Sequence, residues 1–153
     1  MEDLEALIAS VFGDVPRPSN DELLHSECRD PASIVPFEPF QAWQEIPTEV
    51  LCRNYDGMSF FSPAAFRFFL PAFLQATLRL FETSTDFVSD ATIYELNPQS
   101  DYARSRFSLF TPEECQVVAS FLEVMVANPE HADSETAKAA LSGFWSEAAH
   151  GAA

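Results

Sequence analysis

The residue types that could bind a metal or carry out catalysis gather in one short stretch, His25-Ser26-Glu27-Cys28. On a helix, His25 and Cys28 would share a face and could hold one ion together. The pattern His-x-Glu also occurs in zinc deaminases, which need a later Pro-Cys-x-x-Cys pair. Here Pro112-Glu113-Glu114-Cys115 offers one cysteine at the wrong spacing. We therefore predict no metal, no cofactor and no assigned catalytic residue, and keep only His25 and Glu27 as catalytic candidates.

Further candidates lie around the most apolar part of the chain. Tyr55 and Asp56 come just before it and could line a pocket, which makes Asp56 a third catalytic candidate. The other interpretation of Asp56 is a turn or helix-start residue. Arg67 could bind an anion or ligand in a cleft, or it could pack its stem and pair with an acid. With four glycines in the chain, no glycine-rich phosphate loop can be written.

Helices must position these candidates. Apolar residues recur at helical spacing over residues 2–12. The capping box Ser-x-x-Glu at Ser19 predicts a second helix over about 20–28. Prolines should keep residues 30–46 an irregular but packed loop, and a short helix is expected over 47–54.

The central helix is predicted over residues 64–82, because Ser62-Pro63 supplies an N-cap and a proline at the first helical position. Its polar residues form one narrow stripe, so most of its circumference should be buried. Pro71 should kink or split this helix near Phe69 or Leu70.

The second half of the chain should also be helical. Residues 86–96 fit either a helix or a strand, and we favour a helix because no partner strand is evident. Residues 97–106 resemble a polar loop. Helices are expected after Thr111 and over about 135–149. The prediction is an all-α fold, with a single domain over residues 1–153 that forms an irregular bundle of about six helices around the proline-kinked central helix.

A family resemblance rests on the block Tyr55–Leu74, YDGMSFFSPAAFRFFLPAFL, with support from Trp43–Pro47 and Phe107–Glu114. This block resembles the signature of a bacterial family of small helical proteins of unknown function. The resemblance covers about Glu2–Val126 and leaves out the final helix. It implies a bacterial, cytoplasmic origin, and it implies no activity or site residue.

The charge of the chain excludes some partners. The 24 acidic and 8 basic residues give a net charge of −16, which disfavours nucleic acids and anionic membranes. Residues 1–30 carry eight acids against two arginines, and residues 121–153 carry five acids against Lys138. If the terminal helices pack side by side, they would form one negative surface. Such charge either keeps the protein soluble or attracts a basic partner.

The cysteines and the N-terminal residues indicate a cytoplasmic protein. Three cysteines without a CxxC pair predict reduced thiols, and the start Met-Glu-Asp-Leu-Glu lacks the basic region of a signal peptide. We predict a non-enzymatic acidic protein-binding module, such as an inhibitor or immunity-type protein for a basic partner. The alternative is a small cytoplasmic enzyme or ligand-binding protein with a site near His25, Glu27, Asp56 and Arg67.

Overall fold

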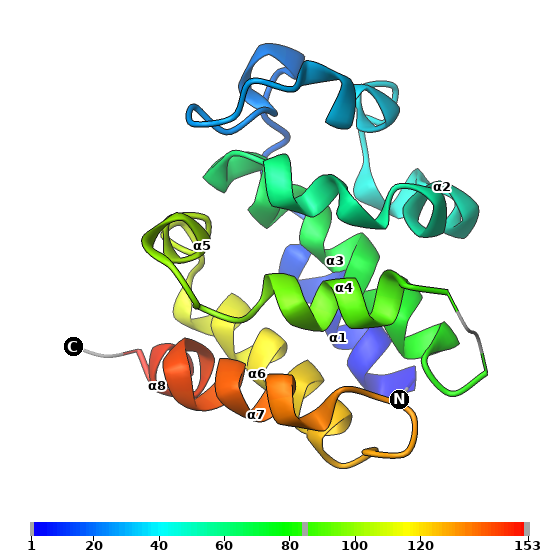
Figure 1. Ribbon diagram of the computed structural model, residues 1–153, viewed down its shortest axis with the longest axis vertical. Helices are drawn as coiled ribbons and strands as arrows, with labels where there is room; N and C mark the ends of the chain where they lie inside the picture. Colours follow the sequence, from blue (N-terminus) through cyan, green and yellow to red (C-terminus); the bar gives the residue numbers. More distant parts are fainter. Residues whose placement is uncertain (1, 84–85, 152–153) are drawn as a thin grey trace.

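The computed structural model describes residues 2–83 and 86–151, and the helix α3, Pro63–Leu80, lies at its centre (Figure 1). The Ser62 hydroxyl accepts a hydrogen bond from the Ala65 N–H at 3.1 Å, and Pro63 occupies the first turn. The predicted cap therefore starts the helix. Twelve side chains of α3 are buried, and they form the middle of the core: Ala65, Phe66, Phe68, Phe69, Leu70, Pro71, Ala72, Phe73, Leu74, Ala76, Thr77 and Leu78.

Pro71 does not split α3, which runs unbroken from Pro63 to Leu80. A proline inside a helix removes one backbone hydrogen bond and crowds the preceding turn. Pro71 is itself buried in the core, so tertiary packing around it offsets that loss.

Other helices surround α3 in the lower part of Figure 1. Helix α1, Glu2–Phe12, packs against α3 and α6, Pro112–Val126, and α4, Val88–Glu95, covers another side of α3. Helix α1 lies against the polar stripe of α3. Gln75 donates to the Glu5 carbonyl oxygen, and Arg79 pairs with the Glu5 carboxylate. Since α4 occupies Val88–Glu95, the helix predicted at 86–96 is confirmed.

A continuous helical run forms the C-terminal side of the molecule. It comprises α7, Ser134–Ala140, the π-helical segment η6, Leu141–Trp145, and α8, Ser146–Ala149. This run packs along α6, and the Trp145 indole N–H donates to the Leu96 carbonyl oxygen at 2.8 Å. Gly143 lies in the π-helical segment, where an added Cβ would stand 2.8 Å from the Pro98 side chain. The last helix therefore holds the segment that follows α4.

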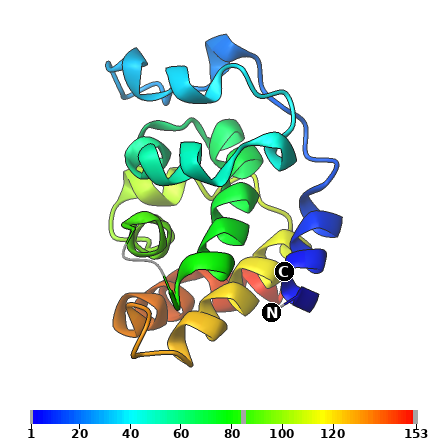
Figure 2. The same cartoon turned by 90° about the vertical axis from the view of Figure 1, so that its right-hand side faces the viewer.

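Short helices cap the other end of α3, at the top of Figures 1 and 2. Phe37 anchors this layer, with its ring 4.9 Å from that of Phe61 and 5.4 Å from that of Phe69. Gly57 lies so close to Phe37 that a Cβ would stand 2.6 Å from the ring. The layer consists of the 3₁₀ turns η1 (Asn20–Glu22), η2 (Pro31–Ser33), η3 (Val35–Phe37), η4 (Trp43–Glu45) and η5 (Tyr55–Phe60), and of α2 (Thr48–Arg53). The predictions of a packed irregular loop and a short helix here are confirmed.

The predicted helix over residues 20–28 is wrong beyond its first turn. The Glu22 carboxylate does accept from the Ser19 N–H and hydroxyl, as a capping box requires. After η1, however, the chain is extended and Leu24 forms an isolated β-bridge with Phe61. The bridge uses backbone bonds from His25 to Phe60 and from Ser62 to Leu23, each 2.8 Å long. Pairing with a distant segment therefore replaces the local helix.

The predicted polar loop over residues 97–106 is also wrong. It contains α5, Asp101–Ser105, whose N-cap Ser100 accepts from the Ala103 N–H at 3.1 Å. Arg106, which follows the helix, is 3% exposed. Apart from the Leu24–Phe61 bridge, the described residues contain no β-structure. The all-α prediction is confirmed.

Phe69 provides a direct test of this core. Its ring is fully buried against Phe37, Phe61 and Phe68, so Phe69→Ala should lower the free energy of unfolding by about 3–5 kcal/mol. Chemical denaturation measures this change. The control Leu109→Ala removes a side chain that is 48% exposed and should change stability by less than about 0.5 kcal/mol. Equal small losses in both variants would contradict the placement of α3 in the core.

Candidate functional site

Helix α4 forms one wall of a surface hollow with two adjoining lobes, which we call the α4 hollow. The aromatic lobe has a volume of about 450 Å³ and is lined by Tyr55, Asp56, Ser59, Phe87, Asp90, Ala91, Tyr94, Glu95 and Asp133. The arginine lobe has a volume of about 360 Å³ and is lined by Ser59, Tyr94, Glu95, Gln99, Ser100, Tyr102, Ala103 and Arg106. The two lobes share Ser59, Tyr94 and Glu95, so they lie next to each other.

The rim of the aromatic lobe combines exposed rings with carboxylates. Phe87 is 65% exposed and Tyr94 is 54% exposed, and the Phe87 ring lies 5.5 Å from that of Tyr55. Asp56 and Asp90 are exposed, and neither forms a salt bridge with any residue that the structure describes. The rim therefore offers aromatic faces and uncompensated negative charge in one place.

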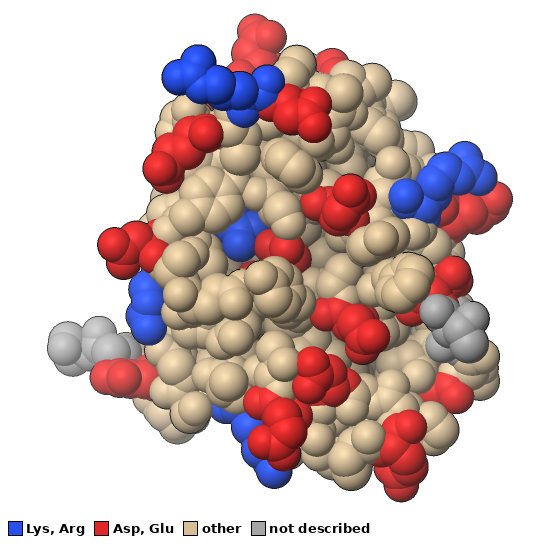
Figure 3. All heavy atoms as spheres, viewed as in Figure 1, with Lys and Arg blue, Asp and Glu red and all other residues tan. Residues whose placement is uncertain are grey.

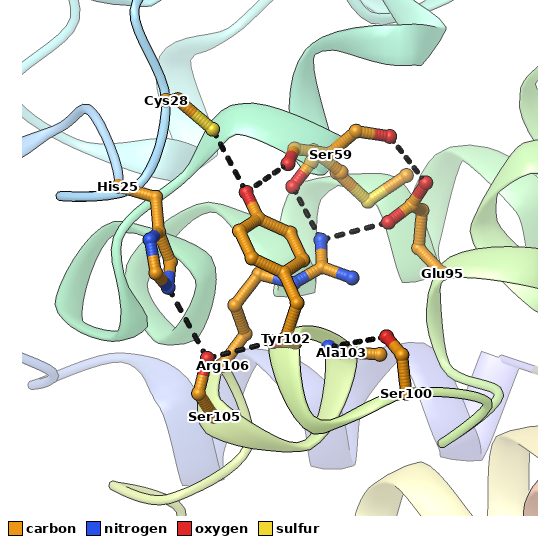
Figure 4. A network of polar contacts seen from close by, with 10 residues as sticks. His25, Cys28, Ser59, Glu95, Ser100, Tyr102, Ala103, Ser105 and Arg106 are labelled. Carbon is orange, nitrogen blue, oxygen red and sulfur yellow. Dashed lines mark hydrogen bonds and ion pairs between the residues drawn. The ribbon is translucent and has the colours of Figure 1, made fainter.

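A buried ion pair forms the floor of the hollow (Figure 4). Nη1 of Arg106 lies 2.7 Å from the Glu95 carboxylate and donates to the Met58 carbonyl oxygen at the same distance. The Ser59 hydroxyl donates to the other Glu95 oxygen at 2.5 Å. Both charged side chains are at most 7% exposed, so these hydrogen bonds must replace the water that each has lost. The pair thus joins η5, α4 and the end of α5.

Two aromatic rings lie against the Arg106 guanidinium. Its central carbon lies 5.0 Å from the ring centre of Phe66 and 5.1 Å from that of Tyr102, within cation–π range. Nε of Arg106 is buried and has no hydrogen-bond partner among the described residues. Nη2 makes no hydrogen bond within that part of the chain either, and Figure 4 shows it pointing to the side where Glu95 and Ser100 lie.

Tyr102 connects this floor to the stretch His25–Cys28. Its hydroxyl donates to the Ser59 carbonyl oxygen at 2.5 Å, and the Cys28 sulfur lies 3.0 Å from the same hydroxyl. Because a hydroxyl has one proton, the Cys28 thiol must be the donor to Tyr102. Burial and the contact with Cys28 raise the pKa of Tyr102, so the phenol stays protonated.

His25 is held in one neutral tautomer. Its Nδ1 accepts from the Glu27 N–H at 3.1 Å, and its Nε2 lies 3.1 Å from the Ser105 hydroxyl. Ser105 donates its own proton to the Tyr102 carbonyl oxygen, so Nε2 of His25 carries the hydrogen and donates to Ser105. Burial lowers the pKa of His25, which Glu27 opposes and Arg106 reinforces. This serine is a donor to the backbone and an acceptor from the histidine, which is the reverse of an activated nucleophile.

The structure does not bring the four sequence candidates together. His25 and Glu27 are neighbours, with His25 5% exposed and packed on Tyr102 at 4.4 Å. Asp56 lines the aromatic lobe, as does Tyr55. Arg67 forms a two-pronged pair with Glu114, at 2.8 and 2.7 Å, which raises its pKa and joins the starts of α3 and α6.

Sequence reasoning missed the two residues at the floor. The sequence pattern predicts a polar loop at Arg106 and fits either a helix or a strand at Glu95, so it marks neither as a site residue. The available signal was an arginine directly before the apolar Phe107, which is weak because such an arginine can also be solvent-exposed. Among the described residues, no group of three or more histidine, cysteine and acidic side chains could hold a metal.

The fold and the hollow together define a small all-α protein with an acidic, aromatic surface depression. A family model described as "Family of unknown function (DUF6714)" matches residues 1–149, so the chain belongs to this family. The match extends beyond the resemblance noted from sequence, because it includes the last helix. No curated protein and no solved structure shows a significant match to the chain. Within the described residues, no helix is long and apolar enough to cross a membrane.

The ion pair at the floor should be essential to stability. Glu95→Gln leaves a buried guanidinium without its counter-ion, so the free energy of unfolding should fall by about 3–5 kcal/mol in a denaturant titration. The matched control is Glu135→Gln, which breaks an exposed pair with Lys138 and should cost less than about 0.5 kcal/mol. A Glu95→Gln variant as stable as the control would show that the pair does not organise the hollow.

His25 should make stability depend on pH. The unfolded chain binds a proton at His25 near pH 6.5, whereas the folded chain does so only at lower pH. In that interval the unfolded state holds more protons, so stability is lost as the pH falls below about 6.5. The free energy of unfolding, measured from about pH 7.5 to about pH 5.5, should fall less steeply in His25→Asn. The exposed His131 serves as control, because His131→Asn should keep the wild-type slope.

Proposed function

We propose that this chain is a non-enzymatic, acidic protein-binding module, of the inhibitor or immunity type, for a partner with a basic face. The observation that carries the proposal is the charge around the α4 hollow. Figure 3 shows this face of the molecule, where acidic side chains outnumber basic ones around a hollowed centre. Asp56 and Asp90 on the rim have no basic partner among the described residues. A field of one sign focused by a concave surface attracts ligands of the opposite sign.

The basic residues do not neutralise the rim acids Asp56 and Asp90, since several are paired with other acids of the same chain. Arg106 is buried against Glu95, and Arg67 is held by Glu114. Arg79 and Lys138 pair with Glu5 and Glu135. Intramolecular pairing of the cations leaves the remaining acids to face solvent, which supports a surface that recognises positive charge.

The proposed binding surface, the rim of the α4 hollow, differs from the surface of terminal helices that the sequence suggests. Helix α6 lies between α1 and the run formed by α7 and α8, so the terminal helices do not form one negative face (Figures 1 and 2). Of the described acids in residues 1–30 and 121–153, Asp133 at the start of α7 lines the aromatic lobe, together with Asp56 and Asp90.

A small ligand-binding protein is the alternative. A volume of about 450 Å³ lies within the range of small-molecule sites, and Asp56 lines this lobe. His25, Glu27 and Arg67 do not line it, which disfavours an enzyme built on those four residues. The proposal includes a bacterial cytoplasm as the setting, and the three free thiols, Cys28, Cys52 and Cys115, support a reducing compartment.

The partner's charge and the salt dependence of binding test this proposal. The intact chain is used as bait at low salt, captured proteins are identified by mass spectrometry, and association rates are measured with the purified partner. A basic partner is expected, with an association rate that falls at least about tenfold between low and physiological salt.

Paired variants locate the contact surface. The double variant Asp56→Asn, Asp90→Asn should slow association several-fold, whereas Asp14→Asn, Asp21→Asn, which removes the same charge away from the hollow, should have a smaller effect. An acidic partner, or an association rate that does not respond to salt, would reduce the charge to a means of solubility.

A further inference from the structure

We propose that the aromatic lobe of the α4 hollow binds one arginine side chain of the basic partner, with a backbone carbonyl oxygen of the same residue accepting from Arg106. This inference rests on the proposed function and identifies the group that enters the hollow. Three features of the described residues lead to it: exposed rings, acids without basic partners, and a guanidinium nitrogen at the floor that lacks an acceptor.

The exposed rings provide the first feature. Phe87 and Tyr94 are among the most exposed large apolar side chains, and both lie on the rim of one lobe with Tyr55. Exposing rings to water is unfavourable, which indicates a surface that is covered in a complex. Aromatic faces attract cations through their quadrupole, and a planar guanidinium also stacks on them.

The charge of the rim selects the sign of the ligand. Asp56, Asp90 and Asp133 line the same lobe as the rings. Asp133 is partly occupied, because it caps α7 through Thr136 at 3.1 and 2.7 Å, whereas Asp56 and Asp90 make no salt bridge within the described residues. A guanidinium can stack on a ring and still donate to carboxylates through its edges, whereas an ammonium acts as a point charge. The combination therefore favours arginine over lysine.

The floor supplies a hydrogen-bond donor for the backbone of the ligand. Arg106 lines the arginine lobe although it is 3% exposed, and Nη2 has no acceptor among the described residues. The buried guanidinium nitrogen without a partner is Nε, whereas Nη2 keeps contact with solvent, so a carbonyl oxygen placed in the arginine lobe would accept from Nη2 in place of water. Because the two lobes share Ser59, Tyr94 and Glu95, one residue can place its side chain in the aromatic lobe and its backbone over the other.

Small probes test the site without knowledge of the partner. N-acetyl-argininamide is titrated into the intact protein, and binding is followed by NMR shifts of α4 and of the Tyr102–Arg106 segment. The expected dissociation constant is on the order of 1 mM, and N-acetyl-lysinamide should bind several-fold more weakly. N-acetyl-leucinamide should not bind, and butylguanidinium, which lacks the carbonyl groups, should bind more weakly than the arginine probe.

Variants of the rim identify the contacts. Tyr94→Leu should weaken the arginine probe roughly fivefold, because it removes a ring face but keeps an apolar side chain. Asp90→Asn should weaken it several-fold at low salt and less at high salt. Both side chains are exposed, so folding should be retained, and circular dichroism checks this. The control Asp14→Asn should leave probe binding unchanged.

The outcomes separate this inference from the proposed function. No shift at about 20 mM arginine probe, equal binding of the leucine probe, or tighter binding of the lysine probe would overturn the arginine site. A basic partner that binds with a salt-dependent rate and is indifferent to Tyr94→Leu would overturn the site alone and leave the proposed function intact. Arginine-selective binding that Tyr94→Leu weakens supports the site, even if the protein partner proves not to be basic.

Discussion

The ion pair between Arg106 and Glu95 is the constraint on which the site depends. Two charges removed from water must replace nearly all of their lost hydration with protein groups. This requirement explains why η5 turns its Met58 carbonyl oxygen and Ser59 hydroxyl inward, and why Phe66 of α3 lies against the guanidinium. The floor of the hollow is thus held by α3, η5, α4 and α5 together, while exposed side chains form its rim.

Each hydrogen bond of the adjoining network has one possible donor. His25 donates to Ser105, Ser105 to the Tyr102 backbone, Cys28 to the Tyr102 hydroxyl, and Tyr102 to Ser59. Because each donor is committed, the network has a single protonation pattern and behaves as a rigid connection between the extended chain near residue 25 and α5. A stretch whose residue types suggest catalysis therefore serves to hold the fold.

The parts of the fold that local chemistry determines could be predicted from sequence. Ser62 and Thr111 start their helices through their own side chains, so the beginnings of α3 and α6 follow from a few neighbouring residues. The stretch after Glu22 also has a local helix signal, but its backbone pairs with Phe61, nearly forty positions away, and no local pattern reports that. Arg106 illustrates the same limit, because a charged residue beside Phe107 looks exposed until its distant partners are known.

The family and the site could likewise be predicted only where the residues concerned are contiguous in the sequence. The block Tyr55–Leu74 was sufficient to indicate the family, because it is contiguous and contains both the cap and the core of α3. Of the hollow, only Tyr55 and Asp56 could be anticipated, since they begin that block and come just before α3. The remaining walls come from α4, α5 and the start of α7, and their meeting is a product of packing.

The π-helical segment η6, near the C-terminus, affects the shape of the hollow from a distance, because it holds the segment that follows α4. One wider turn places Gly143 against Pro98 and lets the Trp145 indole reach Leu96, directly after the helix that forms the wall. A side chain at position 143 would have to displace Pro98, and a one-residue deletion in this turn would rotate Trp145 by about 100° away from its acceptor. The wall of the hollow is thus coupled to chain length and side-chain size in a segment that does not line it, so a change near residue 143 can alter the shape of the hollow.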